Sequence, residues 1–134
     1  HLAWEDFSDL SDVVPLLVNV YPNGSADINE FEQAGGVPML MKRLNELGLL
    51  NTDALPAFGD FTDCMKRPAL VNGILEWHNC GETTDPEVIA PSGHVFQSSG
   101  GIKVLSGNLG QAVIKVSAVS EQHRIIEAPA KVFH

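Results

Sequence analysis

The chain has 134 residues, and its 17 acidic and 8 basic side chains give it a formal charge of −9. A hydrophobic fraction of 44% at this length suits one soluble unit with a core of its own. No apolar run approaches the roughly 18 to 20 residues of a membrane-spanning helix, so we expect no membrane association. An acidic surface repels phosphate backbones, so we also expect no nucleic-acid partner.

The start of the chain carries the spacing and end signals of a helix. Ser8, or Ser11 one turn later, is expected to cap a helix whose apolar stripe reaches Val20. Pro15 would fit the first turn of that helix, where its missing N–H does no harm. Pro22 would end the helix.

Two further helices are predicted before residue 50. Ser25 or Asp27 is expected to cap a short helix that closes at Gly35 and Gly36. A third helix is expected to carry Pro38 in its first turn, where proline is tolerated. It would terminate at Gly48, because glycine readily takes the left-handed conformation that ends a helix.

The middle of the chain gives weaker signals. Residues 61–65 are expected to form a helical turn, with Asp60 or Thr62 as its cap. The stretch 68–77 is ambiguous, since Asn72-Gly73 could be a turn between two short strands. Residues 80–101 are rich in Gly, Pro, Ser, Thr and Asp, which is typical of a long loop and makes this stretch the best internal boundary.

Strands are predicted to dominate the last third of the chain. Gly107 and Gly110 can take backbone angles closed to other residues, so a hairpin turn is expected around Asn108. The residues on either side of this turn are apolar and suit strands. We expect three strands, at about 101–106, 111–119 and 124–133.

The metal-ligating residue types show no metal-binding pattern. Cys64 and Cys80 are the only cysteines, and their spacing matches no zinc framework. Two buried or free thiols in a reducing compartment are expected, because no export signal supports a disulfide. His78, His94 and His123 are scattered without metal-ligand spacing, and we expect them at the surface.

Several motifs, in a fixed order, carry a likeness to one known family. Tyr21-Pro22-Asn23-Gly24-Ser25-Ala26-Asp27 is followed by Gln33-Ala34-Gly35-Gly36-Val37-Pro38. Gly100-Gly101-Ile102-Lys103-Val104-Leu105 precedes Ser106-Gly107-Asn108-Leu109-Gly110, and Ile126-Glu127-Ala128-Pro129-Ala130 follows. With these motifs the chain resembles the dihydroxy-acid and sugar-acid dehydratase family. The likeness is weakest between residues 56 and 99. The residues of the first motif favour the branch of the family that acts on phosphogluconate.

The resemblance implies an α+β chain that crosses the junction of two domains. Residues 1–80 would be a helical segment from the end of an α/β domain that carries the cofactor. Residues 81–134 would be a linker and the first strands of a C-terminal β-barrel domain. The His at position 1 also suggests processing or an excised piece of a longer protein.

The family removes water from a hydroxy acid, with an iron–sulfur cluster as Lewis acid. The resemblance implies a cytoplasmic, homodimeric hydro-lyase that converts 6-phospho-D-gluconate to 2-keto-3-deoxy-6-phosphogluconate. This is the dehydration of the Entner–Doudoroff pathway. Another sugar acid or a branched-chain dihydroxy acid is the alternative substrate, and a non-catalytic binding module is the alternative from a different class.

The resemblance places the cluster's cysteines upstream of this sequence. It places the serine base and an acidic ligand for a divalent metal downstream. We therefore expect no catalytic residue and no metal ligand in this chain, and no activity from it alone.

Five polar residues are candidates for substrate binding. Asn23 and Ser25 lie in a glycine turn ahead of a helix, where free N–H groups can hold an anion. Asn108 lies in the expected hairpin turn. Lys115 and Ser117 lie on one face of the predicted strand 111–119, because side chains alternate along a strand. A purely structural role is the alternative: Asn23 and Ser25 would then only form a turn and a helix cap, and Lys115 would be a solvated side chain on the outer face of its strand.

Overall fold

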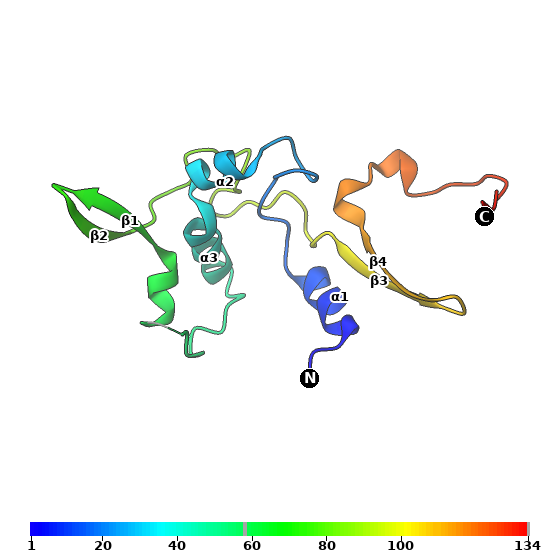
Figure 1. Ribbon diagram of the computed structural model, residues 1–134, viewed down its shortest axis with the longest axis horizontal. Coiled ribbons are helices and arrows are strands. Elements are labelled where there is room, and N and C mark those ends of the chain that lie inside the picture. Colours follow the sequence, from blue (N-terminus) through cyan, green and yellow to red (C-terminus); the bar gives the residue numbers. More distant parts are fainter. Residues whose placement is uncertain (58, 134) are drawn as a thin grey trace.

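The computed structural model describes residues 1–57 and 59–133. The helices come first: α1 (Trp4–Val13), α2 (Ile28–Ala34) and α3 (Gly36–Glu46). After the 3₁₀ helix η1 (Phe61–Met65) come two antiparallel hairpins, β1 (Lys66–Val71) with β2 (Ile74–Asn79) and β3 (Ile102–Gly107) with β4 (Gly110–Lys115). Two short 3₁₀ helices follow, η2 (Val116–Ala118) and η3 (Glu121–His123). Helices followed by small sheets confirm the expected α+β class (Figure 1).

The first helix begins and ends earlier than predicted. α1 stops at Val13, and Val14 is already extended, with φ −89° and ψ 117°. A residue that precedes proline avoids the helical conformation, so Pro15 ends this helix instead of starting one. The predicted helix through Val20 is therefore wrong. None of the helices among the described residues is long and apolar enough to cross a membrane.

The next two helices follow the sequence signals closely. Asp27, and not Ser25, caps α2: its carboxylate accepts hydrogen bonds from Asn29 N at 2.7 Å and Glu30 N at 2.9 Å. The Glu30 carboxylate accepts in return from Asp27 N at 2.7 Å, which completes a capping box. Gly35, with φ 134°, then joins α2 to α3 in a conformation that other residues rarely adopt.

The third helix confirms its predicted signals. Pro38 is the third residue of α3, where no intrahelical N–H is needed. Gly48, with φ 68°, lies just beyond the end of the helix. Its backbone N–H donates to Asn45 O at 2.9 Å, which satisfies a carbonyl of the last turn.

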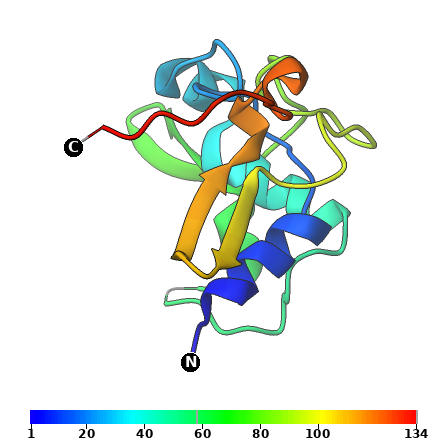
Figure 2. The same ribbon diagram turned by 90° about the vertical axis from the view of Figure 1, so that its right-hand side faces the viewer.

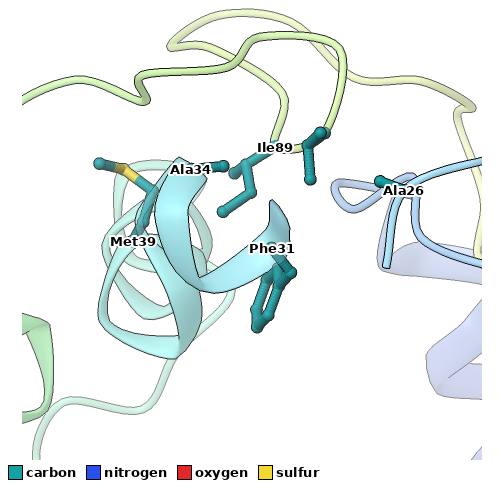
Figure 3. Close-up of a cluster of buried hydrophobic side chains, with 6 residues drawn as sticks. Ala26, Phe31, Ala34, Met39 and Ile89 are labelled. Carbon is teal, nitrogen blue, oxygen red and sulfur yellow. The ribbon is translucent and has the colours of Figure 1, made fainter. Parts of the chain in front are cut away.

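The core lies between α2, α3 and two extended segments, which are far apart in the sequence and hydrogen-bond to each other (Figure 3). Asn19 N donates to Val88 O, and Ala90 N donates to Leu17 O, both at 2.9 Å. The stretch 80–101, predicted as a loop, indeed forms no helix or strand. It nevertheless supplies the centre of the core, because Ile89 is fully buried. The buried hydrophobic residues are Leu17, Ala26, Phe31, Ala34, Met39, Val88, Ile89 and Ala90.

The two hairpins project from opposite ends of the molecule (Figure 1). β1 pairs with β2 from Lys66 opposite Asn79 to Val71 opposite Ile74. The turn residues Asn72 and Gly73 have φ values of 52° and 80°, the signs that a tight two-residue hairpin turn requires. Residues 68–77 thus belong to two strands joined at Asn72-Gly73.

The second hairpin confirms the predicted turn and lies alongside α1 (Figure 2). β3 pairs with β4 from Ile102 opposite Lys115 to Gly107 opposite Gly110. Ser11 fixes the helix to this hairpin, because its hydroxyl accepts from Ile102 N at 3.0 Å.

The predicted end of the strand region is wrong in two places. β4 ends at Lys115, four residues before the predicted limit, and the chain turns into η2. Residues 124–133 form no strand: each of the two sheets in the described part of the chain has two strands, and neither includes this segment. Pro129 also lacks the N–H that a ladder needs.

The chain exposes far more surface than a compact monomer. Its accessible area is 10008 Å², whereas a folded monomer of 14.4 kDa exposes about 6,800 Å². Large apolar side chains on the hairpins and the C-terminal segment lie in this surface, among them Leu70, Trp77, Ile125 and Phe133. Exposed apolar surface on this scale is uncommon in a monomeric soluble protein.

Candidate functional site

Two of the five predicted substrate-binding residues contact each other. The Ser117 hydroxyl donates a hydrogen bond to Asn23 Oδ1 at 2.7 Å, although the residues lie 94 positions apart. Both residues are half-buried. The contact joins the turn before α2 to η2, which follows β4, so the helical and strand-rich parts of the chain meet at this point.

A tight turn places Asn23. Its backbone N–H donates to Val20 O at 2.8 Å, and Gly24 N donates to the same carbonyl at 3.1 Å. A Cβ on Gly24 would lie 2.6 Å from Cγ of Asn19, which real Cβ atoms do not tolerate. The motif needs glycine at this position for steric reasons.

A second close approach places Ser117. Val116 N donates to Gly101 O at 2.7 Å, and a Cβ on Gly101 would lie 2.6 Å from the Ser117 Cβ. Ser117 lies in η2 and not on a strand. The alternation argument that placed it on one face with Lys115 is therefore wrong, and the 3₁₀ turn directs Ser117 toward Asn23.

Asn23 and Ser117 lie in the wall of a cleft of about 370 Å³. Arg124 also lines this cleft, and its Nε donates to Val119 O at 3.2 Å. Among the side chains that the structure describes, those that line the cleft carry amide, hydroxyl and guanidinium groups and no carboxylate: Pro22, Asn23, Gln97, Ser117, Ala118, Val119, Ser120 and Arg124. Such a lining suits a ligand rich in oxygen acceptors.

The sequence prediction missed Arg124 and Gln97. Arg124 stood out only as one of eight cations, and the predicted strand 124–133 gave its side chain no particular direction. Gln97 lay in the predicted loop. The bridge between Leu16 and Gln97 brings that part of the loop to the cleft, and no spacing rule contains such a long-range pairing.

The other three candidates lie outside the cleft. Ser25 is exposed in the turn before α2, and Asn108 is exposed in the hairpin turn. Lys115 is exposed at the last position of β4, opposite Ile102. Their role in substrate binding stays a prediction.

A larger cavity, of about 590 Å³, lies at η1 and the β1–β2 hairpin. Its polar lining includes Asp63 and Lys66, which form an ion pair at 2.7 Å and so satisfy each other. The remaining lining residues are Pro56, Ala57, Gly59, Cys64 and Trp77. We place the candidate site at the smaller cleft, because that cleft gathers polar groups whose hydrogen-bonding capacity is not used up.

The described side chains do not fit an iron–sulfur cluster. Among the side chains that the structure describes, which do not include that of Glu121, no three His, Cys, Asp or Glu residues lie where they could hold one metal ion. Cys64 is exposed and Cys80 half-buried, and both are free thiols, as predicted. Burial raises the pKa of the Cys80 thiol, which disfavours the thiolate that a metal requires.

Comparison with known proteins assigns the family. The model described as "Dihydroxy-acid/6-phosphogluconate dehydratase N-terminal" matches residues 1–63, and its C-terminal counterpart matches residues 87–134. Phosphogluconate dehydratases from Escherichia coli strain K12 and Pseudomonas aeruginosa are 52% and 42% identical over 98% and 99% of the chain. L-arabinonate dehydratase from Rhizobium leguminosarum is 37% identical over 98%. The chain spans only 22% of the length of either phosphogluconate dehydratase. It belongs to the dihydroxy-acid/6-phosphogluconate dehydratase family, as its motifs indicate.

Proposed function

We propose that this chain is part of a hydro-lyase that dehydrates 6-phospho-D-gluconate to 2-keto-3-deoxy-6-phosphogluconate in the Entner–Doudoroff pathway. The observation that carries the proposal is the 52% identity to a phosphogluconate dehydratase over 98% of the chain. Phosphogluconate dehydratases from Rhizobium meliloti and Zymomonas mobilis, at 45% and 46% identity, support the same substrate.

In this proposal the cleft at Asn23 and Ser117 forms part of the substrate site. Because Asn23 Oδ1 accepts from the Ser117 hydroxyl, the Asn23 amide nitrogen is the group left to donate to a substrate oxygen. Ser117 thereby holds the amide in one orientation. Such positioning of a polyhydroxylated substrate is the contribution that these residues make to the reaction.

In this proposal an iron–sulfur cluster would supply the Lewis-acid chemistry of the reaction. Cys64 and Cys80 do not fit it, so in this proposal its ligands come from other parts of a longer protein. The same holds for a divalent metal. We place the whole enzyme in the cytoplasm, where free thiols persist, and as a homodimer, for which the exposed apolar surface offers area.

The test is to purify the full-length protein without oxygen and to measure 2-keto acid formation from 6-phosphogluconate, gluconate, L-arabinonate and a branched-chain dihydroxy acid. We expect the highest kcat/KM on 6-phosphogluconate. No turnover of any of the four acids by the cluster-loaded protein would contradict the proposal and favour a non-catalytic module.

A dehydratase for a sugar acid without phosphate is the second candidate. The observation that favours it is the 37% identity to L-arabinonate dehydratase. This candidate predicts a higher kcat/KM on L-arabinonate or gluconate than on 6-phosphogluconate in the same assay.

A further inference from the structure

Carboxylates neutralise most of the positive charge in this chain. Of the eight cationic side chains, five form ion pairs with carboxylates. Such pairs leave little charge to attract an anionic ligand. The pairs are Lys42 and Arg43 with Glu46 and Glu82, Lys66 with Asp63, Arg67 with Glu32, and Lys103 with Asp12.

Arg124 is placed differently. Its Nε donates to Val119 O, which leaves the two terminal nitrogens of the guanidinium group to donate elsewhere. No carboxylate among the described side chains forms an ion pair with it. Lys115 and Lys131 also lack such a pair, but both lie outside the cleft that Arg124 lines.

Neutral hydrogen-bond donors surround this charge. The cleft presents the side-chain amides of Asn23 and Gln97 and the hydroxyl of Ser120. In a chain of charge −9, a cleft whose described lining includes a guanidinium group and no carboxylate is a place where an anion meets little repulsion from those side chains. The planar guanidinium group can donate two parallel hydrogen bonds to the oxygens of one phosphate.

We infer that this cleft is a phosphate subsite, in which Arg124 and the amides of Asn23 and Gln97 bind the phosphate group of a phosphorylated sugar acid. The inference rests on the proposed function. Dehydration takes place next to the substrate carboxylate, and the phosphate lies at the opposite end of the carbon chain. The described residues that line the cleft include no set fit to hold a metal, so the cleft suits the end of the substrate that does not react.

The test compares Arg124→Met with the wild type in the full-length protein. Loss of a charge-assisted contact is expected to raise KM for 6-phosphogluconate by about 10- to 100-fold. Gluconate, measured as a substrate or as a competitive inhibitor, lacks the phosphate and should be unaffected. The Kd for inorganic phosphate, measured by calorimetry, should rise in the variant. Lys131→Met, which removes a charge outside the cleft, is the matched control and should behave as the wild type.

Two outcomes would overturn the inference. Equal losses on 6-phosphogluconate and gluconate would assign the substrate carboxylate to this cleft. An unchanged Kd for inorganic phosphate would remove the subsite. Arg124→Lys keeps the charge but not the planar fork, so it should give an intermediate KM if Arg124→Met does not fold. If the wild type does not dehydrate 6-phosphogluconate, the proposed function fails, and the phosphate titration still decides the subsite.

Discussion

Ser117 and Asn23 form a hydrogen bond that links the turn before α2 to the end of the β3–β4 hairpin, with 2.7 Å between the Ser117 Oγ and the Asn23 Oδ1. Gly101 lies directly against Ser117, where no larger residue fits. The three residues come from three of the motifs, or their immediate continuations, that carry the family likeness. Their meeting point gives those motifs a common structural reason: Asn23 and Ser117 line one wall of the cleft, and Gly101 packs against Ser117.

Ser117→Ala is expected to loosen this junction. The substitution removes one hydrogen bond and leaves the half-buried Asn23 Oδ1 without its partner, at a cost of about 0.5–1.5 kcal/mol. Native-state amide exchange in the full-length protein should show faster local opening of residues 116–118. Ser98→Ala, an exposed serine elsewhere, is the control. Equal protection in both variants would contradict the role given to the bond.

Gly101→Ala is expected to be more disruptive. The new methyl group would lie 2.6 Å from the Ser117 Cβ, so η2 must shift, and overpacking of this kind costs about 1–3 kcal/mol. KM for the substrate should rise as the cleft wall moves. Gly81→Ala is the matched control, because a Cβ there meets nothing within 4 Å. Similar unfolding midpoints and similar KM values for both variants would show that the contact is not tight.

The local signals of the sequence predicted helices and turns well. Asp27, Pro38 and Asn72-Gly73 each act through their nearest neighbours, so their effect can be read without knowing the fold. The helix predicted through Val20 failed for a local reason as well: Pro15 fits either the start or the stop of a helix, and the apolar run beyond it suits a buried extended segment equally well.

The long-range pairings could not be predicted in the same way. Residues 80–101 have a loop composition, yet the hydrogen bonds between Asn19 and Val88 and between Leu17 and Ala90 bury Ile89 in the core. The site shows the same limit: Asn23 and Ser117 were predicted separately, and Arg124 was found only once the chain path around η3 was known. The division at residues 80 and 81 stays a prediction.

Ile89→Ala tests whether the loop-like segment is part of the core. Ile89 is fully buried among Ala34, Met39 and Val88, and truncation of such a side chain costs about 2–5 kcal/mol. Ile126→Ala removes the same atoms from a side chain that is 78% exposed and should change stability little. Chemical unfolding of the full-length protein measures both. A small loss for Ile89→Ala would mean that the segment only covers the core.

The cap of α2 is expected to make stability depend on pH in the acid range. Backbone N–H groups, first that of Glu30 and then that of Asn29, hydrogen-bond the Asp27 carboxylate and hold its pKa below the ordinary value of 3.8. Folding thus favours the ionised form, so the contribution of Asp27 is fully present above pH 3.8 and is lost as the pH falls through the lower pKa of the folded state.

Asp27→Asn isolates this titration, because asparagine still accepts a hydrogen bond at a helix N-terminus but carries no charge. Thermal unfolding of the full-length protein and the variant should be compared between about pH 3 and pH 6. We expect the melting temperature of the wild type to exceed that of Asp27→Asn by a constant margin at the upper end, and that margin to shrink below about pH 4. Asp53→Asn, an exposed carboxylate outside the helices, is the control and should show no such change. A margin that stays constant down to about pH 3 would show that the Asp27 carboxylate is no more stabilising when ionised than when protonated.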